Sequence, residues 1–262
     1  MNKILFKVHR LLAFLLCVPL LLISLSGSVL VFKHEVDALL MPELVRLAPG
    51  NEVRRSFDEL LSSFYQAYPD YEVTGWQIYA DPGRADLVYV MARGGSEWSS
   101  LFFNQYSGRA LSPPTSPKYY VTDLVREFHY TFLAGDLGLL LGAVVAVLLC
   151  LQSLVGLILH RKFWKVLFTI RYRARPIIYL GDIHKLLGAI SAPVLLVLGF
   201  TGAFWNINQL RHSVQKPPST AYVVGERLYN PALSIDALVQ ESQLRVVGLT
   251  PSFISLPSKP GY

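Results

Sequence analysis

Three long apolar runs constrain this chain more than any other feature of its sequence. They cover about Leu11–Phe32, Leu137–Leu159 and Leu186–Trp205, and each is long enough to cross a bilayer, which takes roughly 20 apolar residues. The chain is 52% hydrophobic and only 16% charged, so we expect an integral membrane protein. The first run exceeds the roughly 7–15 apolar residues of a signal peptide, and we interpret it as a retained anchor.

The Lys and Arg residues beside these runs predict their orientation. Lys3, Lys7 and Arg10 precede the first run, and a basic segment separates the second run from the third. Cytoplasmic loops carry the excess of Lys and Arg, so both places are expected to be cytoplasmic. The more acidic segment between the first two runs then faces outward. The net charge of +6 follows from this bias, and it does not require a nucleic-acid partner.

These observations divide the chain into six segments. We predict a first transmembrane helix (1–34), an outer domain (35–118), a second transmembrane helix (119–160), a basic cytoplasmic loop (161–183), a third transmembrane helix (184–212) and an outer tail (213–262). In the outer domain, Ser56 and Glu59 form a capping-box pattern at the start of an amphipathic helix. Alternating segments at 73–79, 85–91 and 97–104 predict strands that are separated by turns. The domain is therefore expected to be a small α+β domain.

The tail repeats part of this plan. Ser234-Ile-Asp-Ala-Leu-Val is similar to Ser56-Phe-Asp-Glu-Leu-Leu, and Val246–Leu256 predicts a strand. Because a helix and one strand cannot close a domain, we interpret the tail as the start of a second outer domain. We expect a longer protein with four spans, of which this chain holds three.

All six histidines lie at or near the predicted membrane borders. His9, His160 and His184 are expected on the cytoplasmic side, and His34, His129 and His212 on the outer side. Imidazole is a good axial ligand for haem iron, and two helices of a bundle can each offer one. A histidine at a membrane interface can equally be an amphipathic residue with no ligand.

The first and third runs are built to one plan, which favours two of these histidines. His9 precedes Gly27 by the same interval as His184 precedes Gly202, about five helical turns. Both histidines are therefore expected at the same border, where they could share a cofactor. We assign Gly27 and Gly202, which lie deeper, to contacts between helices.

The outer histidines are harder to rank from spacing alone. His34 lies about seven turns from His9 and so shares its helix face. In a continuous helix, His129 and His160 are over eight turns apart and cannot easily both point inward. His129 is therefore preferred over His160, with His34 as a further candidate.

Other chemistry is poorly supported. Both cysteines, Cys17 and Cys150, lie inside apolar runs, and we interpret them as small packing residues. The sequence has no Walker motif, no Gly-x-Gly-x-x-Gly and no zinc-ligand spacing. No catalytic residue is assigned. Asp136 and Gln152 are polar residues at or inside the second run that could hydrogen-bond a ligand, although packing explains them as well.

Several short motifs resemble the PepSY-associated transmembrane family. They are His9-Arg-Leu-Leu with the later Ser-Gly-Ser-Val-Leu-Val-Phe, Glu127-Phe-His129-Tyr-Thr-Phe-Leu-Ala-Gly135, and Asp182-Ile-His184-Lys-Leu-Leu-Gly188. The Asn104-Gln-Tyr-Ser-Gly108-Arg turn resembles a PepSY domain. The resemblance implies an integral membrane α-helical bundle, with three spans here and four in the complete protein, that carries extracytoplasmic PepSY-like α+β domains.

The resemblance also implies a function, because the family includes bacterial inner-membrane siderophore-iron reductases with two haem b groups. Such a protein is an enzyme that passes electrons from an unidentified cytoplasmic or membrane donor to a ferric siderophore in the periplasm and releases Fe(II). His9 and His184 would be the axial ligands of the inner haem iron. His129 would share the outer haem with a histidine of a fourth span, for which His34 or His212 could substitute.

Two other functions are compatible with the same resemblance. PepSY domains are associated with the binding and inhibition of peptidases, so the chain could be a non-enzymatic binding module of the membrane. It could also be an accessory protein of siderophore uptake that binds its ligand without redox chemistry. The sequence names neither the siderophore nor the oligomeric state.

Overall fold

The structure is a computed structural model that describes residues 3–48, 52–160, 168–215, 223–225, 227–230 and 232–258. The chain divides into two compact units. One unit comprises Met1–Val31 and Val125–Pro217, and is helical; the other comprises Phe32–Leu124 and Pro218–Tyr262, and contains a sheet. We describe each unit by itself.

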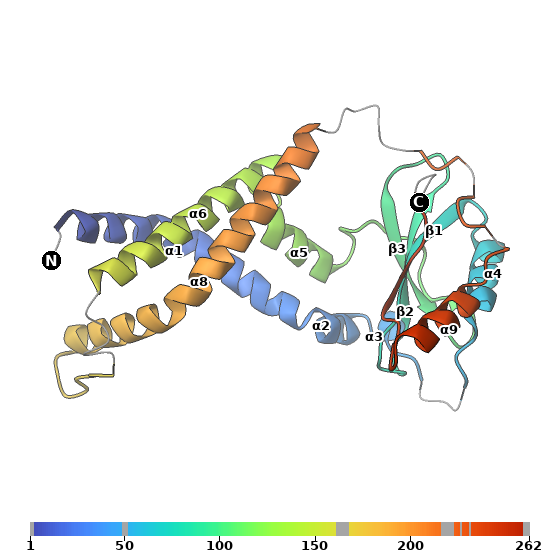
Figure 1. The fold of residues 1–262 in the computed structure, drawn as a ribbon, viewed down its shortest axis with the longest axis horizontal. Coiled ribbons are helices and arrows are strands. Elements are labelled where there is room, and N and C mark those ends of the chain that lie inside the picture. Colours follow the sequence, from blue (N-terminus) through green and yellow to red (C-terminus); the bar gives the residue numbers. More distant parts are fainter. Residues whose placement is uncertain are drawn as a thin grey trace. The chain divides into compact units, whose positions relative to one another are not determined.

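Three long helices build the helical unit, and all are long and apolar enough to cross a membrane. They are α1 (Lys3–Val31), α6 (Gly135–Leu159) and α8 (Pro176–Gln215). Helix α6 packs against both α1 and α8 (Figure 1). The three predicted spans are thereby confirmed. Helix α8 begins at Pro176, inside the segment predicted as a loop, and its 40 residues extend about 60 Å.

Helices α6 and α8 approach closely because one residue between them has no side chain. A Cβ on Gly199 of α8 would lie 2.6 Å from the Cys150 Sγ and 2.9 Å from the Ala146 carbonyl oxygen, both on α6. Small residues at contacts of this kind let helices associate in lipid, where no hydrophobic effect drives them together.

The segment predicted as one helix over 119–160 forms two helices instead. Helix α5 (Val121–Thr131) ends before α6 begins, and the φ angles of Phe132, Leu133 and Gly135 between them are 49°, 61° and 55°. A right-handed helix cannot continue through positive φ angles. A Cβ on Gly138 would lie 1.6 Å from the Thr131 carbonyl oxygen, so the corner also requires glycine there. Counting turns from His129 to His160 through one helix was therefore wrong.

The second unit contains a five-stranded antiparallel sheet in the order β4-β3-β2-β1-β5. The strands are β1 (Tyr71–Gln77), β2 (Asp86–Ala92), β3 (Trp98–Asn104), β4 (Arg109–Ala110) and β5 (Phe253–Ser255). The first three lie within two residues of their predicted positions. Before β4, the Asn104 side chain accepts hydrogen bonds from the amides of Tyr106 and Ser107, and Gly108 has a φ of 71°, which a glycine adopts without strain.

Helices cover both faces of this sheet. Helix α4 (Phe57–Ala67) and helix α9 (Ile235–Arg245) bury a core with alternate strand residues that include Val88, Val90 and Leu101. Helices α2 (Lys33–Leu40) and α3 (Pro42–Val45) contribute to a smaller core on the residues that point the other way, such as Phe102. The strand alternation that the sequence showed thus serves two cores. Helices α2 and α3 lie in a part of the chain for which the sequence analysis named no separate helix.

The tail joins the first sheet rather than starting a second domain. Strand β5 pairs antiparallel with β1, with Trp76 opposite Ile254, and α9 packs beside α4. The physical reason is the edge of β1, whose backbone groups are paired only once β5 is added. The predicted strand over 246–256 is reduced to 253–255. Our interpretation of 213–262 as a separate domain was therefore wrong for the residues that the structure describes.

The two similar helix starts cap each other. The Asp236 carboxylate accepts hydrogen bonds from the amides of Phe57 and Asp58, each at 2.9 Å. In return, the Asp58 carboxylate accepts from the Ser234 hydroxyl at 2.5 Å and the Ile235 amide at 2.8 Å. Carboxylates at a helix N-terminus satisfy amides that lack a partner within the helix. The sequence repeat is thus a reciprocal contact within one domain.

Candidate functional site

Two histidines from different membrane-spanning helices meet at one end of the helical unit. The ring centres of His9 on α1 and His184 on α8 lie 6.2 Å apart, and the ring planes are inclined by 69°. Two imidazoles that bind one metal ion from opposite sides at about 2 Å each hold their ring centres roughly 6 Å apart. The structure therefore brings together the two histidines that the sequence repeat singled out, at a separation that suits one shared metal ion.

A cavity of about 480 Å³ adjoins this histidine pair. Cofactor and ligand sites typically enclose roughly 300–1,000 Å³ and are mostly apolar with a few polar groups. This cavity fits that description, because its apolar wall carries a small number of polar residues: His9, Gln152, Ser153, His160, His184, Lys185 and Ser191. Gly156 of α6 also lines it, and a Cβ there would lie 3.2 Å from the His9 ring. Glycine at this position lets α6 approach the His9 ring.

Polar atoms at this cavity are left without partners. Among the described residues, the His9 Nδ1 and the Gln152 Oε1 are buried and form no hydrogen bond. The Gln152 Nε2 lies 3.4 Å from the His9 Nε2, which is a weak contact. Buried polar atoms are nearly always paired in proteins. This site therefore suits a bound group whose metal ion takes imidazole as a ligand.

The Nδ1 atom of the His129 ring contacts α1. This atom lies 3.1 Å from the Ile23 carbonyl oxygen and 3.0 Å from the Ser26 hydroxyl. A carbonyl oxygen can only accept, so the Nδ1–H is the donor in this contact, and in the neutral ring the lone pair then lies on Nε2. Histidines that bind metals usually donate their second ring N–H to a carbonyl or carboxylate in this way. The structure thus gives His129 the tautomer of a ligand, although no described residue offers a second imidazole beside it.

The Ser26-Gly27 step explains why His129 fits at this place. A Cβ on Gly27 would lie 3.0 Å from the His129 Cε1, a distance tighter than an ordinary van der Waals contact. We had assigned Gly27 to general helix contacts, and the structure gives it a specific neighbour. Ser26 and His129 are 103 residues apart in the chain, and no local pattern links them.

The remaining histidines occupy three different settings. His160 ends α6 and lines the same cavity as His9 and His184, which the sequence argument had discounted because it assumed one continuous helix. His212 is exposed in the last turn of α8. Next to it in the chain, the Ser213 hydroxyl donates to the Asp136 carboxylate, whose two oxygens lie 2.7 and 2.8 Å from the Ser213 Oγ, so this carboxylate joins α6 to α8.

His34 lies in the sheet unit and has its own partners. The Arg84 Nη2 donates to its Nδ1 at 2.8 Å, and its ring contacts the Tyr79 ring edge-on at 5.3 Å. Burial lowers the pKa of His34, and the nearby charge of Arg84 lowers it further. His34 is therefore a neutral acceptor for Arg84 at physiological pH, and its role as a ligand stays a prediction.

Three membrane-spanning helices with a separate soluble α+β domain define a multi-pass membrane protein. The family described as PepSY-associated TM region matches residues 6–242, and the chain belongs to this family. It is also 34% identical over 88 residues to an uncharacterised protein of Pseudomonas aeruginosa; the match covers 34% of this chain and 22% of that protein. The name of this relative states no activity, so the function of the chain is argued from the site.

Proposed function

We propose that the chain is a haem-b-containing reductase of the bacterial inner membrane that passes electrons across the bilayer to ferric siderophores. The observation that carries this proposal is the His9–His184 pair, with ring centres 6.2 Å apart beside a cavity of about 480 Å³. Imidazole is a common ligand of haem iron, and His9 and His184 would hold the haem here. Bound haem would supply a one-electron carrier inside an apolar environment.

The chain's own residues would then hold and tune that group. His9 and His184 would be the axial ligands, and Gly156 leaves room for the His9 ring. Lys185 lines the cavity and could pair with an anionic propionate, because a cation beside an apolar pocket is a suitable partner for a carboxylate. Gln152 lies beside His9, so its unpaired oxygen could accept a hydrogen bond from the ring N–H that a metal-bound His9 retains.

The opposite end of α1 supports a second ligand site. His129 docks at Ser26, which lies about 25 Å along α1 from His9, a distance close to the roughly 30 Å thickness of the hydrocarbon core. Ligands near both borders are what transfer across a membrane requires. In this proposal one electron from a cytoplasmic or membrane donor reduces each ferric ion to Fe(II) on the periplasmic side, and Fe(II) leaves a siderophore far more readily.

A reduced-minus-oxidised visible spectrum of the purified chain, with a pyridine haemochrome count, tests the proposal. We expect a low-spin b-type spectrum in the wild type and the loss of one haem per chain in both His9→Ala and His184→Ala. Gln209→Ala is the matched control, because this exposed residue lies on α8 with His184 but away from the cavity. Gel filtration in detergent identifies variants that merely misfold.

A second measurement addresses the reaction itself. The dithionite-reduced protein, freed of reductant, should convert a ferric siderophore to Fe(II) that a chromogenic chelator captures, and His184→Ala should not. A wild-type protein that purifies colourless after expression with ample haem would refute the reductase. That result would leave the non-enzymatic binding module as the better account.

A further inference from the structure

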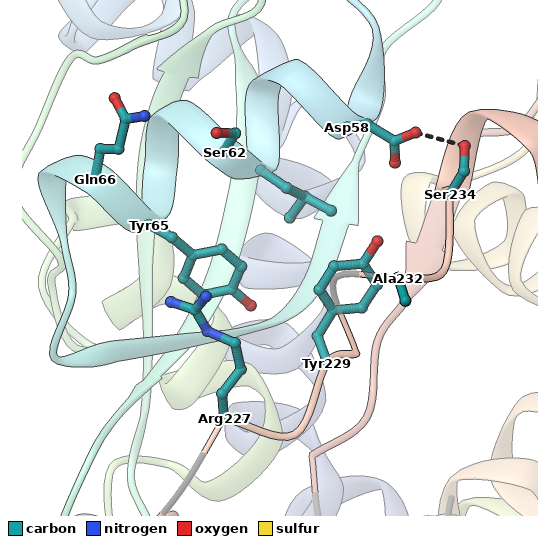
Figure 2. A pocket seen from close by; sticks show the side chains of 9 residues that line it. Asp58, Ser62, Tyr65, Gln66, Arg227, Tyr229, Ala232 and Ser234 are labelled. Atoms are coloured by element: carbon teal, nitrogen blue, oxygen red, sulfur yellow. Dashed lines mark hydrogen bonds between the residues drawn. The ribbon is translucent and has the colours of Figure 1, made fainter.

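A second cavity lies in the sheet unit, between α4 and the segment that leads into α9. Its volume is about 490 Å³, within the range of small-molecule sites. Asp58, Leu61, Ser62, Tyr65 and Gln66 of α4 form one wall, and Arg227, Tyr229, Ala232 and Ser234 form the other. Figure 2 shows both walls facing each other. The proposed electron transfer makes no use of this cavity.

Arg227 supplies a positive charge that no acid in the cavity neutralises. Its guanidinium carbon lies 4.0 Å from the centre of the Tyr65 ring, and Figure 2 shows the two groups side by side. None of the ion pairs within 4.0 Å that join described residues involves Arg227. Asp58, the acid among the lining residues, uses both its oxygens to cap α9. Arg227 therefore keeps its hydrogen-bond donors available on the cavity side.

The Arg227 side chain is also anchored in advance. The Tyr65 hydroxyl donates to the Glu72 Oε1 at 3.1 Å, and the same oxygen accepts from the amides of Leu228 and Tyr229 at 3.1 Å each. Glu72 is fully buried, so it ties the two chain positions after Arg227 to the ring on which Arg227 stacks. Ordering these groups beforehand reduces the entropy that a ligand must overcome.

The lining residues indicate which kind of ligand fits. A planar guanidinium recognises a carboxylate through two parallel hydrogen bonds. Arg227 covers the Tyr65 ring, so the Tyr229 ring, which also lines the cavity, is left as the flat surface against which an aromatic ring packs. Ser62 and Gln66 add neutral polar groups. We propose that this cavity binds a small aromatic carboxylate, with its anionic group on Arg227 and its ring against Tyr229.

Benzoate binding to the full chain in lipid nanodiscs tests this proposal. Ligand-observed NMR titration measures the affinity and does not depend on haem. Cyclohexanecarboxylate keeps the charge but loses the flat ring, and benzylamine keeps the ring but reverses the charge. The variants are Arg227→Gln, which removes the charge, and Tyr65→Leu, which removes the ring that supports the Arg227 guanidinium. Arg109→Gln is the matched control, because Arg109 is an exposed arginine of the same unit at β4.

We expect wild type and Arg109→Gln to bind benzoate equally and better than either comparison compound. Arg227→Gln should bind about ten-fold or more weakly, since a charge-assisted hydrogen bond is lost, and Tyr65→Leu should also bind more weakly. No saturable benzoate binding by the wild type, or equal binding by Arg227→Gln, overturns the proposal. His9→Ala should bind benzoate normally, so the outcome is separate from that of the haem proposal.

Discussion

Because α4 and α9 cap each other, we predict that a substitution in the tail destabilises α4, which lies 178–179 residues earlier in the chain. Asp236→Ala removes the carboxylate that accepts from the amides of Phe57 and Asp58 at 2.9 Å. Ser56 does not compensate, because its hydroxyl accepts from the Glu59 amide instead. Loss of a helix cap costs about 0.5–2 kcal/mol. With two amides left unpaired, we expect a value near 1.5–2 kcal/mol.

Hydrogen–deuterium exchange of the full chain, read by mass spectrometry, measures this loss directly. A destabilisation of about 1.5–2 kcal/mol corresponds to exchange of the α4 amides that is roughly 10–30-fold faster. Asp70→Ala is the control, because Asp70 is an exposed acid of the same unit that lies outside this contact. If the tail formed part of a separate domain, α4 would exchange alike in both variants, and our assignment of the tail to the first sheet would be refuted.

The reverse substitution sharpens the same test. Asp58→Ala removes the acceptor of the Ser234 hydroxyl and the Ile235 amide, so α9 should exchange faster by a similar factor. The two caps join the same pair of helices. The double variant should therefore differ from the sum of the single variants by about 0.5 kcal/mol or more, as contacting residues do. Strict additivity would mean that the two caps act independently.

Two further predictions concern stability. Asp86 is fully buried, pairs with Arg54 and accepts from the Trp76 indole at 2.6 Å, so Arg54→Ala should destabilise the domain by about 3–5 kcal/mol at pH 7. Burial raises the pKa of Asp86, and losing Arg54 raises it further. The folded state then binds the proton more tightly than the unfolded state, so the loss of stability caused by Arg54→Ala should shrink as pH falls through the raised pKa of Asp86. Thermal unfolding of wild type and variant at pH 7 and pH 5 measures this. A loss of stability that grows at pH 5 contradicts the prediction. Gly199→Leu should separate α6 from α8 and lower the midpoint of thermal unfolding. Gly181→Leu should leave that midpoint unchanged, because a Cβ there would meet nothing within 4 Å. Equal effects of the two substitutions would contradict the close contact between α6 and α8.

The features that could be predicted from the sequence are those with a local cause. Apolar length alone identified α1, α6 and the centre of α8. Alternation placed β1, β2 and β3, because Val88 and Val90 must point into one core while their neighbours do not. The Ser56 capping pattern located the start of α4. Each of these follows from residues within about ten positions of one another.

The features that could not be predicted depend on contacts between distant residues or on backbone geometry. The pairing of Trp76 with Ile254 leaves no trace in the periodicity of either strand. The corner at Phe132 and Leu133 has ordinary side chains in an unusual backbone, and it misled the argument about His160. The short helix α3 was not predicted; it has Pro42 in its first turn, a position that suits proline.

The repeat of the first and third apolar runs extends to side-chain detail, and its exceptions are informative. The Ser26 hydroxyl bonds back to the carbonyls of Leu22 and Ile23, and the Thr201 hydroxyl does the same to Val197 and Leu198. At the histidine end the two copies are equivalent, since each contributes one ring to a single pair.

At the small-residue end the two copies differ. Gly27 lies against the His129 ring, whereas a Cβ on Gly202 would have only an ordinary contact with Ala146 at 3.7 Å. A metal ion with two axial histidines needs both rings, and the described residues supply both at the His9 end alone. The proposed function therefore rests on the end of the repeat where His9 and His184 form a pair. His129, although held in the tautomer of a ligand by Ile23, supports the proposal without being able to carry it.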